Sequence, residues 1–414
     1  GRTLPSLLDE ACDRYPNPLA LNQWRDRCWQ PLANADFRTA AEEFALGLMD
    51  LPLQRGDRIA FLMHSGIAFS IADMGCLLAG LVDVPIDLTQ TIENIVFILQ
   101  HTETPTLIVS NLDLLQQVLP YLREVSSLQY VVVAEVPEQW EQMLAQQCRE
   151  GSVGNPSRHP PDHCLHIPQV LGDGQTEETH LLPLFPPEIR LFSLTEIQQR
   201  GRSQWSTERV QALRQAIAPS DLATILYIAS ETKRPKGVML SHENISADIL
   251  SAFASHPGLE AGDREVALLF LPLTHIFARA FLYGHLAYGH CVFFSDPNHV
   301  IKHLQSVRPT VLITVPRLLE KVYERMLDQA KRLSRFDQTV YGWALKLAQR
   351  YQVGKLPHPL DALQFKLADR LVFAQWRSIF GNRLKALISG GAALRGDLTN
   401  LFSAAGIPVL QGYG

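Results

Sequence analysis

The residues best suited to chemistry lie in one turn-rich stretch of the chain, residues 226–245 (LYIASETKRPKGVMLSHENI). An apolar, strand-like run leads into a loop that holds the hydroxyls of Ser230 and Thr232 and the positive charge of Lys236. A loop of this composition between two strands is suited to holding a phosphate group. It is not a Walker loop, because the pattern GxxxxGK[ST] is absent. The stretch therefore predicts a phosphate-binding loop, followed by a helix that Ser241 can cap.

The segments around this loop alternate between short apolar runs and helix-length stretches. Strands are predicted at 58–62, 82–86, 106–110, 129–134, 224–228, 266–270, 291–294, 310–315, 384–389 and 407–411. Helices are predicted at 66–80, 93–101, 112–123, 242–254, 316–333 and 361–380. Strands that alternate with helices of this length indicate parallel βαβ units covered on both faces. The predicted fold class is α/β.

Two stretches break this alternation. The start of the chain, before the strand predicted at 58–62, is expected to be irregular. Residues 150–189 hold seven prolines and four histidines, and we expect a long surface excursion there. This organisation predicts a first α/β subdomain at 1–150, an irregular excursion at 151–200, and a second α/β subdomain at 201–414 that contains the phosphate loop.

Composition excludes several classes of protein. The 414 residues are 46% hydrophobic and 19% charged with a mean hydropathy near zero, so wholesale disorder is excluded. A net charge of −5 removes the electrostatic case for a general nucleic-acid binder. Six scattered cysteines without a CxxC pair favour a reducing, cytoplasmic location. The apolar stretches 66–82 and 266–277 are short or interrupted, and we expect buried core elements there.

One group of residues has the side chains of a metal site. His159, His163, Cys164 and His166 lie close together in the proline-rich stretch. Their spacing fits no standard zinc pattern, so a solvated loop is the preferred interpretation. No metal-ligating residues are therefore predicted.

The phosphate loop resembles the signature of the adenylate-forming (AMP-binding) superfamily, Tyr-Thr-Ser-Gly-Thr-Thr-Gly-x-Pro-Lys-Gly-Val. The positions that match in register are Tyr227, Thr232, Pro235, Lys236, Gly237 and Val238, followed by a family-like Ser241–Asn244. Further blocks in the family's order are Ala79–Pro85, Leu271–Ala280, Val315–Tyr323, Ile388–Leu394 and Gly406–Gly414. The block at Val315–Tyr323 is similar to one typical of long-chain fatty-acyl synthetases. The resemblance thus spans most of the chain.

The resemblance implies a two-step reaction. A fatty-acid carboxylate attacks the α-phosphate of ATP, giving an acyl-adenylate and pyrophosphate, and a thiol of coenzyme A or acyl-carrier protein then takes the acyl group. Magnesium would offset the charge of the phosphates. The implied fold has two stacked βαβ subdomains and a smaller β-rich subdomain, as in the N-terminal domain of a long-chain fatty-acid CoA ligase or acyl-carrier-protein synthetase.

The resemblance also assigns roles to single residues. His275 and Lys236 take catalytic roles, with His275 near the carboxylate. The implied nucleotide-binding residues are Tyr227, Ser230, Thr232, Lys236, Gly390, Gly391, Ala392, Gln411, Gly412, Tyr413 and Gly414. Tyr413 would stack on the adenine. Each residue also has an ordinary interpretation: Tyr413 as a packed aromatic, His275 as a core histidine, and Lys236 as a solvated turn lysine.

The phosphate loop departs from the family pattern. Family Thr, Ser, Gly, Thr and Gly are replaced by Ile228, Ala229, Ser230, Glu231 and Lys233. Two glycines that permit close approach are thereby lost. Two unit charges 4 Å apart repel by about 4 kcal/mol at an effective dielectric of 20, so Glu231 would oppose a triphosphate. We expect weak ATP binding, unless the loop is adapted and orders with substrate.

The second departure concerns the end of the sequence. In the family, the Tyr-Gly is followed by a magnesium-binding Glu, then a ribose-binding Asp, a hinge and a small C-terminal domain with a catalytic lysine. These lie beyond Gly414, so the chain alone is expected to be inactive or partly active.

Two alternatives stay open: a homologue that binds an acyl chain or acyl-carrier protein without ATP, and a nucleotide-binding regulator. The sequence also leaves open the oligomeric state and a peripheral membrane contact.

Overall fold

The computed structural model describes residues 1–137, 166–170, 176–180, 186, 188–229, 234–256, 258–355 and 359–412. The chain divides into two compact units, each built from segments distant in sequence. The first unit comprises Gly1–Arg38, Ser65–Ile67 and Glu243–Gly414, and the second comprises Thr39–His64 and Ala68–His242. These units differ from the consecutive ranges that the sequence suggests, because strands close to the N-terminus pair with strands late in the chain.

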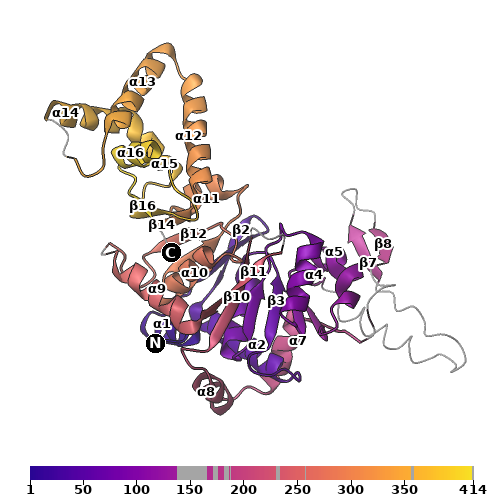
Figure 1. Ribbon diagram of the computed structural model, residues 1–414. Helices are drawn as coiled ribbons and strands as arrows, with labels where there is room; N and C mark the ends of the chain where they lie inside the picture. Colours follow the sequence, from indigo (N-terminus) through magenta and orange to yellow (C-terminus); the bar gives the residue numbers. More distant parts are fainter. Residues whose placement is uncertain are drawn as a thin grey trace, which may run out of the picture. The chain divides into compact units, whose positions relative to one another are not determined.

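The second unit is built on a seven-stranded sheet with the order β11-β10-β4-β3-β5-β6-β9 (Figure 1). Its strands are β3 (Arg58–Leu62), β4 (Val82–Pro85), β5 (Thr106–Val109), β6 (Tyr130–Val133), β9 (Arg190–Ser193), β10 (Leu222–Ile228) and β11 (Lys236–Ser241). Only the β10–β11 pair is antiparallel. The central strands β4, β5 and β6 are buried along their whole length, which explains their continuous apolar runs.

Most helices of the second unit lie between its strands along the chain, and α2 begins in the first unit. Polar side chains fix where several of them begin. They are α2 (Asn34–Met49), α3 (Ile67–Leu78), α4 (Ile92–His101), α5 (Leu112–Val118), the 3₁₀ helix η1 (Leu119–Glu124), α7 (Leu194–Ser203) and α8 (Thr207–Ala216). The Thr91 hydroxyl caps α4 by accepting from Asn94 N at 3.3 Å. Asn111 caps α5 by accepting from Leu114 N at 3.0 Å.

The first unit holds another seven-stranded sheet, with the order β16-β15-β14-β12-β13-β1-β2. Its strands are β1 (Leu21–Arg25), β2 (Cys28–Leu32), β12 (Val266–Leu269), β13 (Cys291–Phe294), β14 (Val311–Thr314), β15 (Ala386–Ser389) and β16 (Val409–Gln411). All neighbours are parallel except the β1–β2 hairpin at one edge. The β1–β13 pairing is the contact that brings the N-terminal segment into this unit.

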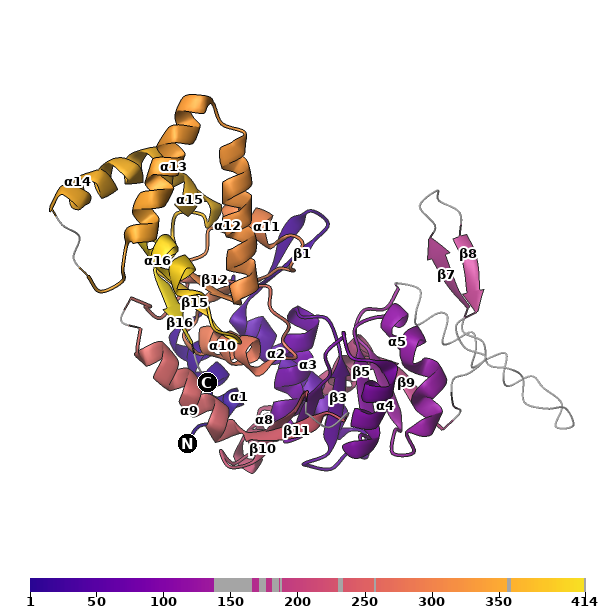
Figure 2. The same cartoon turned by 45° about the horizontal axis from the view of Figure 1, so that its top comes forward.

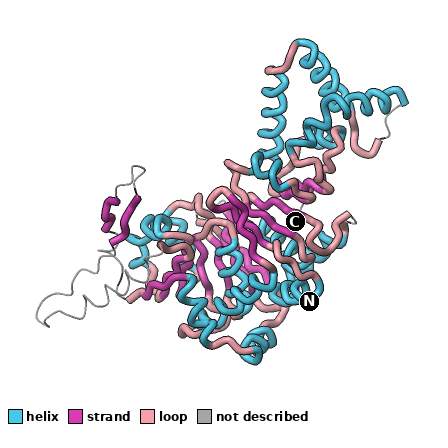
Figure 3. The backbone as a smooth tube through the Cα atoms, turned by 180° about the vertical axis from the view of Figure 1, so that it is seen from behind, coloured by secondary structure: helices cyan, strands magenta, loops and turns pink. Residues whose placement is uncertain are grey.

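Helices cover this sheet and extend beyond it (Figures 2 and 3). They are α1 (Leu4–Arg14), α9 (His242–Ala254), α10 (Ile276–Ala287), α11 (Val300–Val307), α12 (Pro316–Lys331), α13 (Arg335–Arg350), α14 (Pro359–Ala368), the π-helical turn η2 (Asp369–Phe373), α15 (Ala374–Ile379) and α16 (Gly396–Ala404). Helices α12 to α15 form a helical group between β14 and β15. Among the described residues, no helix is both long and apolar enough to cross a bilayer.

The α/β class is confirmed. The irregular start is wrong, and so is the end of the 151–200 excursion, while residues 151–165 of that stretch lie outside the described residues. The start of the chain is ordered: α1 is capped by Thr3, whose hydroxyl accepts from Ser6 N at 3.3 Å, and the β1–β2 hairpin follows. Within 151–200, β9 and α7 belong to the second unit, while β7 (His166–Val170) and β8 (Thr176–His180) pair with each other. These elements escape the pattern because they are short and mostly polar.

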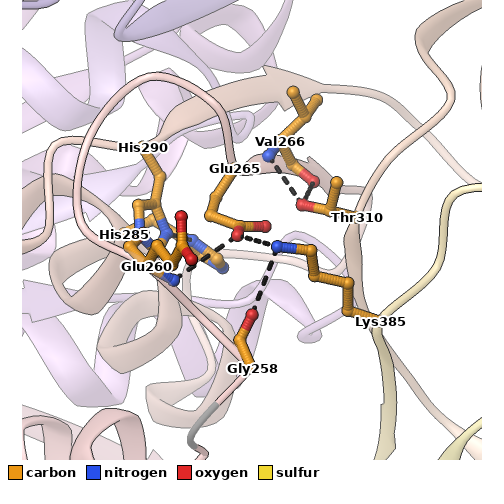
Figure 4. A network of polar contacts seen from close by, with 8 residues as sticks. All are labelled: Gly258, Glu260, Glu265, Val266, His285, His290, Thr310 and Lys385. Carbon is orange, nitrogen blue, oxygen red and sulfur yellow. Dashed lines mark hydrogen bonds and ion pairs between the residues drawn. The ribbon is translucent and has the colours of Figure 1, made fainter.

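A polar network fastens the amino ends of four parallel strands in the first unit (Figure 4). Glu265 precedes β12, His290 precedes β13, Thr310 precedes β14 and Lys385 precedes β15. The fully buried Glu265 carboxylate forms an ion pair with the Lys385 ammonium. Lys385 Nζ also donates to Gly258 O at 3.2 Å. The network therefore ties strand ends that are remote in sequence.

Burial alone would raise the pKa of the Glu265 carboxyl. Hydrogen bonds from Lys385, from Thr310 and from the Glu260 backbone outweigh that effect and lower the pKa below its ordinary value of 4.5. The carboxylate is therefore held ionised, and its partners are what make its burial tolerable.

A buried pair of histidines continues this network. His290 Nε2 lies 2.9 Å from Glu260 O, which can only accept, so this nitrogen carries the proton. His290 Nδ1 then accepts from His285 Nδ1 at 2.8 Å, and both rings are neutral. Burial lowers the pKa of His290 to about 4, and burial together with His290 lowers the pKa of His285 well below its ordinary range.

Replacing Lys385 by Met should destabilise the fold by roughly 2–4 kcal/mol, because a buried carboxylate loses its ion-pair partner. We place the effect at the lower end of the range because the Lys385 side chain is 42% exposed. Urea unfolding measures it. Lys331→Met is the matched control, since the side chains of its pair with Asp328 are 76% and 64% exposed, and it should shift stability by less than about 0.5 kcal/mol. Equal shifts for both variants would contradict the assignment.

The histidine pair predicts a loss of stability in acid. The pKa of His290 is about 4 in the native state against an ordinary 6.5, so the unfolded chain takes up a proton first as the pH falls through this window. His290→Gln keeps one donor and one acceptor but cannot titrate. Its free energy of unfolding should depend less steeply on pH, by about 1.4 kcal/mol per pH unit.

Urea titrations at several pH values within this window measure the slope. The exposed His299 provides the control variant His299→Gln, which should keep the steep dependence of the parent. A His290→Gln profile parallel to that of the parent would exclude a role for His290 in the acid loss.

Candidate functional site

The carboxyl ends of the parallel strands in the first unit bring several predicted residues to one sheet edge. Gly390–Ala392 directly follow β15, and Gly412 follows β16. His275 lies on the segment that leaves β12. Open parallel sheets bind ligands outside the carboxyl ends of their strands, so this edge is the expected place for a site.

Phe277 packs against two of these strand ends. A Cβ atom added to Gly390 would lie 2.8 Å from Phe277 Cζ, and one added to Gly412 would lie 3.8 Å from Phe277 Cε2. Backbone bonds hold both glycines in the ladder: Gly390 N donates to Thr314 O at 3.0 Å, and Gly412 N donates to Ser389 O at 2.9 Å. The first turn of α10 is therefore in contact with the loops after β15 and β16.

Gly391 shapes the exposed backbone at this edge. Its φ of +75° lies in the left-handed region, which glycine adopts without strain. A Cβ there would meet only Val315 Cγ1, at 3.7 Å, so the space beside the backbone is open. Gly391 and Ala392 are exposed, whereas Gly390 is buried. This arrangement is an accessible backbone shelf of the kind that a flat ring can approach closely.

His275 is exposed at the start of α10, with extended backbone angles of −97° and 132°. Its exposure does not fit the interpretation as a core histidine. A turn precedes it, in which His275 N donates to Pro272 O at 3.1 Å. Ser65, from the segment between β3 and α3, accepts from Leu273 N at 2.8 Å and so fixes the loop before His275.

Sequence reasoning missed Phe277 and Ser65 as site residues. Phe277 is close to the predicted His275, but its contacts with Gly390 and Gly412 join positions far along the chain. Ser65 stands in a short turn after a strand, where a serine is ordinary. The sequence offered one indication, since Phe277 lies in the same motif block as His275.

The phosphate loop belongs to the second unit, and its base is the β10–β11 hairpin. Tyr227 faces Gly237 across this pair, where a Cβ on Gly237 would lie 3.3 Å from Tyr227 Cζ. The Tyr227 hydroxyl and His101 Nδ1 are hydrogen-bonded at 2.5 Å. Burial raises the pKa of the Tyr227 phenol. The predicted nucleotide residue Tyr227 is thus engaged in holding the hairpin to α4.

Aromatic and cationic contacts extend this anchor to the end of the loop. His101 stacks on Phe97 with ring centroids 5.2 Å apart, and the Arg234 guanidinium lies 5.2 Å from the Phe97 ring centroid. Lys236 is exposed as the first residue of β11, opposite Ile228. An exposed lysine there is free to move toward a phosphate group, as the functional interpretation requires.

Four predicted residues, Ser230, Thr232, Tyr413 and Gly414, lie outside the described residues. Gln411 is exposed at the end of β16. In the part of the chain that is described, no group of three His, Cys, Asp or Glu side chains could hold a metal ion. Of the predicted nucleotide-binding residues, the described ones at this sheet edge are Gly390, Gly391, Ala392, Gln411 and Gly412.

The fold matches solved structures over the whole chain. An adenylation–carrier didomain of carboxylic acid reductase from Segniliparus rugosus, in complex with AMP, matches with a TM-score of 0.69 and 18% identity, over 100% of this chain and 53% of that one. The N-terminal domain of FACL13 from Mycobacterium tuberculosis matches with a TM-score of 0.61 and 16% identity, over 100% and 76%. At these identities the likeness shows the fold alone.

Similar sequences carry a consistent description. The long-chain-fatty-acid–CoA ligase FadD15 of Mycobacterium bovis is 28% identical over 94% of this chain, and the ligase ACSBG2 of Mus musculus is 25% identical over 100%. The chain spans about half the length of these relatives, 56% of each. The family model described as AMP-binding enzyme matches residues 8–414. With its strands, glycine shelf and hairpin in place along that match, the chain belongs to the AMP-binding enzyme family.

Proposed function

We propose that the whole protein activates a fatty acid with ATP, forming an acyl-adenylate, and then transfers the acyl group to a thiol of coenzyme A or acyl-carrier protein. The observation that carries this proposal is the exposed backbone at Gly391 on the carboxyl edge of the sheet, next to Gly390, against which Phe277 packs. A long, apolar acyl group is favoured because the relatives named above are long-chain fatty-acid ligases.

Each part of the chain has a defined task in this proposal. The backbone after β15 accepts the adenine, on which Tyr413 would stack from the loop after β16. Lys236 neutralises phosphate charge, and the exposed His275 orients the carboxylate. The chemistry is mostly positioning and charge stabilisation, which needs few reacting side chains.

A second candidate is a homologue that binds an acyl chain or acyl-carrier protein without using ATP. The altered phosphate loop favours it, because Ser230 and Lys233 stand where the family has glycine and Glu231 adds a negative charge. A reducing, cytoplasmic location suits either candidate, since Cys12, Cys28, Cys76 and Cys291 are free thiols in the described chain.

The two candidates differ in nucleotide affinity. Calorimetric titration of the folded chain with ATP plus magnesium, and separately with AMP, distinguishes them. Binding of both at micromolar concentration would support the enzyme, and the whole protein would then be assayed for acyl-adenylate formation. Binding of neither nucleotide would favour the homologue that does not use ATP.

Restoring the family residues should strengthen ATP binding if the altered loop is the weak part. The triple variant Ser230→Gly, Glu231→Thr, Lys233→Gly regains two glycines and removes the Glu231 carboxylate, and it also removes the Lys233 ammonium. We expect about a tenfold gain in ATP affinity, since the glycines allow the backbone to approach the phosphates and the lost lysine offsets only part of the relieved repulsion of about 4 kcal/mol. AMP has fewer phosphate charges and should gain less. An unchanged ATP affinity in the triple variant would locate the weakness elsewhere.

Replacing Tyr413 by Ala tests the adenine contact. Loss of an aromatic ring that stacks on a base should weaken AMP binding by about 1–3 kcal/mol. Tyr121, a tyrosine that is 40% exposed, gives the matched control Tyr121→Ala, which should bind AMP as the parent does. Calorimetry with AMP measures both variants. If Tyr413→Ala binds as tightly as Tyr121→Ala, the stacking role of Tyr413 is excluded.

A further inference from the structure

A stripe of leucines is exposed on the helical group of the first unit. Leu363, Leu367 and Leu371 are 69%, 52% and 47% exposed. They recur at every fourth residue along α14 and η2, so they lie on one face. Figures 1 and 2 both show α14 at the outer side of the group formed with α12, α13 and α15.

The same face carries positive charge. Lys366 and Arg370 are exposed and fall three residues after Leu363 and Leu367, between the leucines. Asp369, an acidic residue of this helix, is in an ion pair with Arg377. The outer face of α14 and η2 therefore combines leucine and cationic side chains, and we call it the Leu–Lys face (Leu363, Lys366, Leu367, Arg370 and Leu371).

The opposite side of these helices is fastened to the protein. Val372, Phe373 and Trp376 are 3%, 1% and 2% exposed. The Trp376 ring packs on Phe373 and on Tyr341 of α13, with centroids 5.0 and 5.6 Å apart. The inner side of these helices is therefore packed, and the exposed leucines lie on the side that faces away from these contacts.

Charge is unevenly distributed along the chain. Residues 316–380 contain twelve Lys and Arg against six Asp and Glu, a net charge of +6, within a chain of net charge −5. The remainder therefore carries −11. A cationic helical segment on an acidic protein complements an anionic surface and disfavours non-specific contact by the rest of the molecule.

We propose that the Leu–Lys face docks the protein on an anionic membrane surface. Leucines of such a helix enter the headgroup region while lysine and arginine meet lipid phosphates, as in amphipathic helices that lie in the interface. A second copy of this chain fits the face poorly, because pairing two such faces would place the positive charges of Lys366 and Arg370 opposite the same charges of the other copy. The inference does not rest on the proposed reaction, since it uses no nucleotide contact.

Vesicle sedimentation tests this proposal with the chain as it stands. The parent should bind vesicles of phosphatidylcholine with about 30% phosphatidylserine and should ignore pure phosphatidylcholine. Binding should weaken in about 0.5 M salt. The partition coefficient of the charge variant Lys366→Glu/Arg370→Glu should fall at least about tenfold. Each lost cation accounts for about fivefold, and the new glutamates are also repelled by the anionic lipid.

Two further variants make the result specific. Leu363→Gln/Leu367→Gln/Leu371→Gln should lose binding by a comparable factor, because apolar insertion is removed at exposed positions that leave the core intact. The control Arg123→Glu/Arg190→Glu makes the same change in net charge at exposed positions of the second unit and should bind as the parent does. Thermal melts and AMP titrations are expected to match the parent in all variants.

The inference would be overturned if the parent did not bind anionic vesicles, or if the charge variant bound them as well as its control does. A concentration-dependent dimer that the leucine variant abolishes would assign the face to a second copy instead. Binding to an acidic carrier protein but not to vesicles would assign it to a protein partner. Because nucleotide titration is measured separately, loss of membrane binding does not affect the test of the proposed reaction.

Discussion

The common direction of the parallel strands is the constraint on which the first unit depends. From β13 through β12, β14 and β15 to β16, each strand runs parallel to its neighbour, so all amino ends share one edge and all carboxyl ends share the other. Every loop at the carboxyl edge is thereby placed beside loops that are remote in sequence. Gly390 after β15 and Gly412 after β16 thereby come to the same edge of the sheet.

The two edges of this sheet are built for different tasks. The amino edge is closed by buried charge and neutral histidines, with Glu265 and Lys385 joining β12 to β15. The carboxyl edge instead has exposed backbone at Gly391 and an exposed His275. Strong polar contacts on the far edge can hold strand positions without occupying the space where a ligand would bind. Stability and binding are therefore separated in space, which allows the binding edge to remain open.

Sequence reasoning predicted best where burial is complete. The run at Arg58–Leu62 matches β3 residue for residue, and Thr106–Val109 was found within one residue, because both strands need an unbroken apolar face on each side. The β1–β2 hairpin was missed since most of its side chains are exposed or half-buried. Phe277 was missed as a site residue because its partners are fixed by sheet order, which local periodicity does not encode. The motif residues in the sequence indicated the carboxyl edge of the sheet, but the strand order determines which side chains lie next to them there.

In the β10–β11 hairpin, the residues that hold the structure are likewise different from those predicted to bind phosphate. Tyr227 keeps its family identity, yet its ring covers Gly237 and its hydroxyl bonds to His101. These contacts hold the base of the loop whatever stands at its tip. Ser230, Glu231 and Lys233 take no part in these contacts, so we expect their differences from the family to change charge and backbone freedom more than the fold. Tyr227 and Gly237 therefore match the family because they hold the hairpin together, and their match by itself says little about whether the loop binds a nucleotide.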